Sequence, residues 1–362
     1  MLDVLALMAP FFGLVALGWI AARRGLLPVD GIGGLMTFVL YFALSALLLR
    51  LSAQGRLQAG ASATLLLVYA AASLAVMALG LWWARRAGLS RRNGALVALV
   101  TAFPNTGFLG LPLLTSLLGP DAAGPVAATL LIDVLVSCSL AMAWAHSHPH
   151  PHPGTSAGEP DDLPAHDPGP LAALLSSLKG ALRNPLLLAM AIGLAVSALG
   201  LSLAKPVDDV LRLLGQASTP AALVTLGAIV ARSQMRPGLA VGAVRGVGGA
   251  AAGEGAGEGA RAVAGAVAPS LWWLVALKLL VHPALVWLAA ALAAELGHAL
   301  PPLSVLALTL AAALPSAANV SMLAEREGAD TAMVARVILW TTAAAVVTLL
   351  LWSSVLRVHA AV

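Results

Sequence analysis

The chain has 362 residues, of which 60% are hydrophobic and only 10% are charged, and its mean hydropathy is +0.93. So few charges cannot cover the surface of a water-soluble domain, so the composition predicts an integral membrane protein. The single cysteine, Cys138, excludes an intramolecular disulfide framework. The net charge of +4 comes from basic residues scattered between apolar runs, which argues against nucleic acid as a partner.

Ten apolar segments are long enough to cross a bilayer as helices. A hydrocarbon core of roughly 30 Å requires about 20 helical residues. The first segment has no basic region before it and no cleavage motif after it, so we expect it to be retained as a span. The expected spans cover residues 2–22, 31–51, 61–86, 94–118, 124–146, 181–203, 208–231, 269–294, 302–324 and 331–355.

The basic residues between these spans predict the orientation. If the N-terminus lies outside, thirteen Lys and Arg residues fall on the inner side and five on the outer side, as the positive-inside rule requires. The inner residues are Arg23, Arg24, Arg85, Arg86, Arg91, Arg92, Lys179, Arg183, Arg232, Arg236, Arg245, Arg261 and Arg326. The outer residues are Arg50, Arg56, Lys205, Arg212 and Arg357. We therefore expect a multi-pass protein of the inner (plasma) membrane with both termini outside.

Two long cytoplasmic segments are too poor in large apolar residues to fold by themselves. Residues 147–180 form a linker rich in His and Pro, and residues 232–268 form a loop rich in Gly and Ala. The stretch HSHPHPHP at 146–153 could bind a divalent metal through its alternating histidines. No carboxylate or cysteine completes a tetrahedral set, so we expect a solvated linker and no metal site.

The linker divides the chain into residues 1–146 and 181–356, with five expected spans in each part. Because five is odd, a structural repeat between the two parts would be inserted in opposite orientations, as in many secondary transporters. The fourth span of each part contains helix breakers, FPNTG at 103–107 and LPSAAN at 314–319. The alternative is that both are ordinary proline kinks, which membrane helices tolerate. Two interruptions at matching positions favour a substrate site near the middle of the bilayer.

A proline within a helix removes one backbone donor and clashes with the preceding turn, so each span is expected to divide into two half-helices. Two half-helix ends that meet would hold an anion without any full positive charge. Gly107 and Gly110 would allow the ligand or backbone to approach closely. The predicted substrate-binding residues are Pro104, Asn105, Thr106, Gly107, Pro315, Ser316 and Asn319.

Three ionisable residues inside expected spans, away from the span ends, are functional candidates. An ionised side chain at the centre of a membrane helix costs about 2.5–3.5 kcal/mol, so such residues usually face a cavity or each other. Asp133 is a candidate for proton or cation coupling, Lys278 for pairing with it or with substrate, and His282 for proton relay. The alternatives are a structural hydrogen bond for Asp133, extension of Lys278 toward the membrane surface, and an interior hydrogen-bonded imidazole for His282.

Four sequence blocks resemble the bacterial branch of the auxin efflux carrier family. They are NTGFLGLPLL (105–114), LLGQASTPAALVTLGA (213–228), KLLVHP (278–283) and LPSAANVSMLAEREG (314–328). The resemblance implies an all-α fold of ten transmembrane helices in two inverted five-helix repeats, with crossing broken helices 4 and 9, similar to sodium/proton antiporters and bile-acid symporters. It further implies a scaffold of helices 1, 2, 6 and 7, and a mobile core of helices 3, 4, 5, 8, 9 and 10.

The resemblance also implies a substrate of the small organic anion class, such as a carboxylate. The chain departs from the family pattern in the second span, where Ser45 stands in place of a proline and puts a kink there in doubt.

These observations predict a secondary active transporter that works by alternating access. A passive channel or facilitator for small polar solutes is the alternative. The chain has no P-loop sequence and no H-E-x-x-H or G-x-S-x-G motif, so we expect neither an ATPase nor another enzyme, and no cofactor. Neither the solute, nor the choice between H⁺ and Na⁺ as coupling ion, nor a homodimer follows from the sequence.

Overall fold

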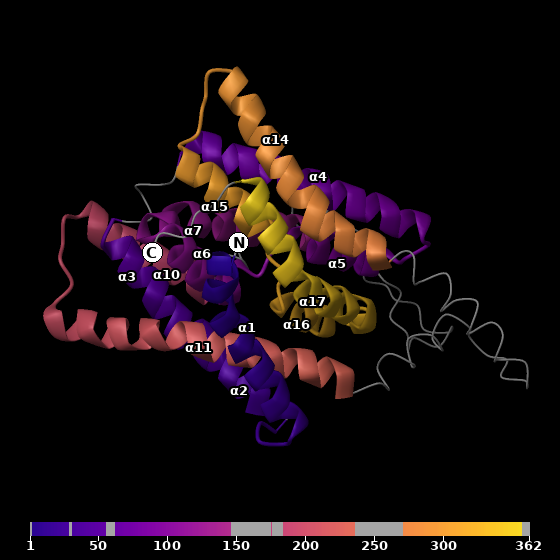
Figure 1. Ribbon diagram of the computed structural model, residues 1–362, viewed down its shortest axis with the longest axis horizontal. Coiled ribbons are helices and arrows are strands. Elements are labelled where there is room, and N and C mark those ends of the chain that lie inside the picture. Colours follow the sequence, from indigo (N-terminus) through magenta and orange to yellow (C-terminus); the bar gives the residue numbers. More distant parts are fainter. Residues whose placement is uncertain are drawn as a thin grey trace, which may run out of the picture.

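The computed structural model describes residues 2–28, 31–55, 62–145, 175, 184–235 and 271–356. Every regular element in this part of the chain is a helix (Figure 1). The predicted linker 147–180, apart from residue 175, lies outside the described residues, and so do the histidines at 146–152 and residues 236–268 of the predicted loop.

Six helical segments are long and apolar enough to cross a membrane, which confirms a multi-pass membrane protein. They are Gly31–Ala53, Ala63–Arg86, Pro120–Ala145, Lys205–Arg232, Leu271–Glu295 and Thr331–Val355. Four shorter apolar helices are Ala9–Arg23, Thr106–Leu118, Pro185–Ala198 and Pro302–Ala312. The count of ten spans therefore stays a prediction.

Polar caps determine where several helices begin. Ser62 precedes α4 (Ala63–Arg86), and its hydroxyl accepts the backbone N–H of Leu65 at 3.1 Å. Ser90 caps α5 (Arg91–Ala102) in the same way through Asn93 N–H at 3.3 Å, so this helix begins before the expected residue 94. Such caps satisfy donors that a helix leaves unpaired in its first turn.

The sixth and seventh expected spans differ from their predicted bounds. The helix α10 (Pro185–Ala198) begins after Asn184, whose side-chain oxygen accepts Leu186 N–H at 2.9 Å, and it is shorter than the expected 181–203. The next helix, α11 (Lys205–Met235), is longer than the expected 208–231. The turns beyond the expected bounds carry the charged residues Lys205 and Arg232, which an apolar segment excludes.

Two segments are interrupted where the breakers lie. The helix α5 ends at Ala102 and continues after a gap as the π-helical η2 (Thr106–Gly110) and α6 (Leu111–Leu118). Later in the chain, α15 (Pro302–Ala312) ends, and α16 (Asn319–Arg326) begins after a second gap.

Three further π-helical segments lie within continuous helices. In the second segment, α2 (Gly31–Phe38) passes through η1 (Val39–Leu44) into α3 (Ser45–Ala53). The hydroxyl of Ser45 donates to the Leu40 carbonyl at 2.7 Å, so a serine accompanies a helix irregularity where the family pattern has proline. The other two are η4 (Asp133–Cys138), between α7 (Ala123–Ile132) and α8 (Ser139–Ala145), and η5 (Leu277–Val281), before α14 (His282–Glu295).

One group of helices is built around two close crossings. The helix α1 (Leu2–Arg23) packs on α11, where a Cβ at Gly18 would overlap the backbone of Val224 and one at Gly227 would overlap that of Val15. Glycine lets these two backbones touch, as small residues do at many membrane helix crossings. In the same group, α3 packs against α10 and α11.

A second group packs around α4. This helix contacts α5 and α14, and α14 in turn contacts α15, while α17 (Thr331–Val355) packs against α5 and α16. Figure 1 shows α4, α5 and α14 together on the side of the molecule away from α1 and α11. The two gaps lie between elements of this second group.

Candidate functional site

The two gaps are hydrogen-bonded to each other. The Asn105 N–H donates to the Pro315 carbonyl at 2.8 Å, and the Ala317 N–H donates to the Phe103 carbonyl at 2.9 Å. Pro104 and Ser316 thereby form an isolated antiparallel bridge. The structure thus brings together the two breakers that the sequence places in separate parts of the chain.

Ser316 holds the crossing in place through two further hydrogen bonds. Its hydroxyl donates to the Val100 carbonyl at 2.7 Å, and its N–H donates to the hydroxyl of Thr341 in α17 at 3.1 Å. Thr341 is a supporting residue that sequence reasoning missed, because its hydroxyl also bonds the Val337 carbonyl of its own helix at 2.7 Å and so resembles an ordinary helical threonine.

Three buried polar atoms at the crossing have no hydrogen-bond partner among the described residues. They are Nδ2 of Asn105, the hydroxyl oxygen of Thr106 and Oδ1 of Asn319. Asn105 is 1% exposed and Thr106 is 0% exposed. Because buried polar atoms are nearly always paired, these atoms indicate a place for a polar ligand or for water. All three belong to the residues that the sequence predicts for substrate.

The two glycines of the first gap have different surroundings. A Cβ on Gly110 would lie 2.6 Å from Cδ1 of Leu314, so this glycine permits the second gap to approach. A Cβ on Gly107 would make only ordinary contacts, at 3.9 Å, with Leu44 and Leu186 of the other helix group. Gly107 therefore lies where the two helix groups meet.

The half-helix ends give the crossing its electrostatic character. The resumed helices begin at Thr106 and Asn319, and helix N-termini carry partial positive charge from their aligned peptide dipoles. Unpaired side-chain atoms lie on these same two residues. This arrangement suits an anion, since helix N-termini bind anions without a charged side chain.

The three ionisable candidates lie in one buried cluster behind the second gap. Asp133, Lys278 and His282 are each 0% exposed. The Lys278 ammonium donates to the carbonyl of Ala312, the last residue of α15, at 2.6 Å. The alternative in which Lys278 extends to the membrane surface is therefore wrong. Its ammonium instead compensates the partial negative charge at the C-terminus of a half-helix.

Two residues that sequence reasoning missed complete this cluster. The Tyr69 hydroxyl donates to the two carboxylate oxygens of Asp133, at 3.1 and 3.2 Å, and the Tyr69 ring lies 5.8 Å from that of His282. The Ser73 hydroxyl lies 3.2 Å from Nε2 of His282. The spacing of four residues, which places Tyr69 and Ser73 on one face of α4, is a signal that could have indicated them.

Hydrogen-bonding capacity assigns the roles within the cluster. Nζ of Lys278 lies 3.4 Å from Nδ1 of His282, and an ammonium group has only donors. An ammonium at Lys278 would require Nδ1 to accept, and a neutral His282 would then carry its proton on Nε2, toward the Ser73 hydroxyl. In the described part of the chain, no three His, Cys, Asp or Glu side chains lie close enough together to hold a metal.

Comparison with known proteins identifies the family. The sequence profile of the family described as "Membrane transport protein" matches residues 3–353. A protein of Rhizobium meliloti (strain 1021) named "Putative malonate transporter" is 28% identical over 352 residues, which is 96% of this chain and 94% of that protein. The chain belongs to the membrane transport protein family, the family of the auxin efflux carriers that it resembles. It is a transporter and not an enzyme.

Proposed function

We propose that the protein is a secondary active transporter for a small carboxylate anion, which binds where the two gaps cross. The observation that carries the proposal is the set of unpaired polar atoms on Asn105, Thr106 and Asn319, at two half-helix N-termini. A carboxylate would accept from Nδ2 of Asn105 and from the hydroxyl of Thr106. The name of the relative, "Putative malonate transporter", supports the same substrate class.

The proposed architecture has two inverted five-helix repeats, residues 1–146 and 181–356, that contribute one broken helix each. The proposed scaffold contains α1, α2–α3, α10 and α11, and the remaining helices form the core. The packing of α1 on α11 and of α3 on α10 supports this division. Alternating access would then move the crossing, as part of the core, past Leu44 and Leu186 of the scaffold.

The buried cluster is the proposed site of coupling to H⁺ or Na⁺. It is linked to the crossing through Lys278, whose ammonium bonds the Ala312 carbonyl just before the second gap. A change in the charge of Asp133 would alter the electrostatic environment of Lys278, since the two charges interact. The state of the cluster would thus influence the end of the half-helix beside the substrate.

Substitution of the asparagines tests the binding site. Asn105→Ala removes the donor Nδ2, and Asn319→Ala removes the acceptor Oδ1, which would reach the anion through a bridging water; a lost hydrogen bond to a charged group costs about 1.5–3 kcal/mol. We expect malonate to bind roughly ten- to hundredfold more weakly to each purified variant by calorimetry. Ser116→Ala is the control, because the Ser116 hydroxyl already bonds the Pro112 carbonyl at 2.8 Å. Unchanged malonate affinity in both asparagine variants would remove these residues from the site.

Counterflow in proteoliposomes separates a carrier from a passive channel, and dependence on an ion gradient separates a coupled carrier from a facilitator. If the protein is a carrier, proteoliposomes preloaded with unlabelled malonate should transiently accumulate labelled malonate, because the binding site faces one side of the membrane at a time. Repeating the assay with a Na⁺ gradient and with a pH gradient identifies the coupling ion. Uptake that neither saturates nor shows counterflow would favour the channel.

A further inference from the structure

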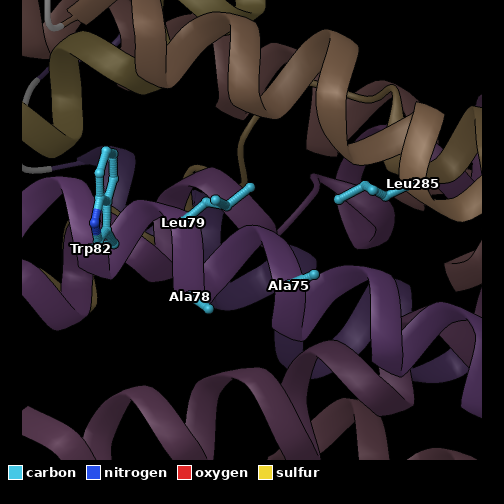
Figure 2. A pocket seen from close by; sticks show the side chains of 5 residues that line it. All are labelled: Ala75, Ala78, Leu79, Trp82 and Leu285. Carbon is cyan, nitrogen blue, oxygen red and sulfur yellow. The ribbon is translucent and has the colours of Figure 1, made fainter.

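An apolar groove lies on the outer surface of the second helix group, between α4 and α14. It is lined by Ala75, Ala78, Leu79, Trp82 and Leu285, and it has a volume of about 530 Å³. Figure 2 shows Leu79 and Trp82 rising from α4 and Leu285 reaching toward them from the facing helix. The two alanines leave the space that the larger side chains border.

The groove belongs to the surface that faces the hydrocarbon core. Its walls come from the membrane-crossing segments Ala63–Arg86 and Leu271–Glu295. Trp82 is 49% exposed and Leu79 is 37% exposed. An apolar depression at this depth gains dispersion contacts when a hydrocarbon chain fills it.

The distance along α4 from the inner end of the groove to Arg86 matches the depth of one leaflet. From Ala75, beside Leu285, to Arg86 at the end of α4, the helix rises about 16 Å at 1.5 Å per residue. This rise is close to half of a hydrocarbon core of roughly 30 Å. The groove therefore runs from the middle of the bilayer toward the α4–α5 turn at one interface.

The Arg86 side chain lies at the polar end of the groove. The guanidinium of Arg86 lies over the ring of Trp82, 4.7 Å from its centroid. Within the described residues, no carboxylate lies within 4 Å of Arg86. Its neighbour Arg85 lies over Trp144 instead, at 4.5 Å. Arg86 is thus the basic side chain directed to the groove.

We propose that the groove binds an acyl chain of an anionic phospholipid whose phosphate pairs with Arg86. The apolar walls fit the chain, the length fits a single leaflet, and the guanidinium fits the phosphate. The proposal does not depend on the transported solute. It adds a lipid contact to α4 and α14, the helices that hold Tyr69, Ser73 and His282.

Native mass spectrometry of the purified full-length protein, with added phosphatidylglycerol or phosphatidylcholine, tests the proposal. The wild-type protein should retain phosphatidylglycerol in preference to phosphatidylcholine. Arg86→Ala should weaken phosphatidylglycerol retention about fivefold, the effect of one basic residue at an anionic surface. Arg24→Ala is the matched control, since Arg24 is an exposed arginine at the end of α1, away from the groove.

A second pair of variants tests the groove itself. Ala78→Trp fills the groove and should abolish retention of the lipid, whereas Leu67→Trp, at a 70% exposed position of the same helix, should retain it. Equal retention of the two lipids by the wild-type protein, or undiminished retention by Ala78→Trp, would overturn the proposal. The same spectra report the oligomeric state, so a dimer lost specifically in Ala78→Trp would assign the groove to a protein interface instead.

Discussion

At the scale of a single residue, Lys278 makes two interactions. Its ammonium donates to the terminal carbonyl of α15, and its charge interacts with that of Asp133. Loss of the ammonium removes the donor from the buried Ala312 carbonyl. It also removes the positive charge that interacts with the buried Asp133 carboxyl group. Leaving a buried polar atom without its partner generally costs more free energy of unfolding than the intact hydrogen bond contributes.

Lys278→Met should therefore destabilise the protein by about 1–3 kcal/mol, the usual cost of leaving a buried carbonyl without its donor. Adding Asp133→Asn should recover part of the loss, because the amide needs no cation. Thermal unfolding of the purified variants in detergent measures both effects. Lys205→Met serves as control, since Lys205 is exposed at the start of α11. A Lys278→Met protein as stable as the wild type would show that the ammonium is dispensable.

The same residues show how far the sequence predicts the site. Pro104, Pro315 and the asparagines near them were identifiable because prolines and amides interrupt an apolar helix at a cost, and so they stand out in a membrane span. The hydrogen bond from Tyr69 to Asp133 was not predictable, because it depends on how α4 and η4 are rotated toward each other. The sequence allowed Lys278 to be buried or to extend to the membrane surface, and only the position of the Ala312 carbonyl decides between the two.

At the scale of the helix, π-helical segments accompany the functional candidates. Thr106 begins η2, Asp133 begins η4, and Lys278 lies in η5. Such segments often mark functional sites, since the extra residue frees a carbonyl and redirects a side chain. In η5 the Leu279 carbonyl accepts from the indole nitrogen of Trp352 at 3.0 Å. Hydrophobic periodicity located these helices but not their irregular turns, because a single additional residue hardly alters an apolar run.

The crossing of α1 and α11 gives a prediction about glycine. Gly227→Ala would place a Cβ against the backbone of Val15 and Trp19, so the helices must separate, and such overpacking costs about 1–3 kcal/mol or more. Gly13→Ala is the matched control on α1, because nothing lies within 4 Å of the added Cβ. We expect a lower unfolding temperature for Gly227→Ala and an unchanged or higher one for Gly13→Ala. Equal unfolding temperatures for the two variants would contradict the close crossing.

At the scale of the whole molecule, the distribution of basic residues predicts the sidedness of the turns. Ala87 lies in the turn after α4, and Leu201 lies in the connection between α10 and α11. The four arginines beside Ala87 place that turn in the cytoplasm by the positive-inside rule, and the expected topology places Leu201 outside.

Single-cysteine labelling measures this sidedness. The native cysteine is first replaced by Cys138→Ala, and Ala87→Cys or Leu201→Cys is then introduced. An impermeant thiol reagent should label Leu201→Cys in intact cells, and should label Ala87→Cys only after the membrane is permeabilised. Labelling of both variants from the same side would refute the predicted arrangement of the spans.

The bonds between residues 103–105 and 315–317 join stretches that are encoded more than two hundred codons apart. Neither stretch can change its backbone alone, because each supplies an amide that the other one requires. These bonds use backbone atoms alone, so side chains in either stretch can be exchanged to change the solute without losing them, as long as proline is excluded at residues 105 and 317, whose N–H groups donate.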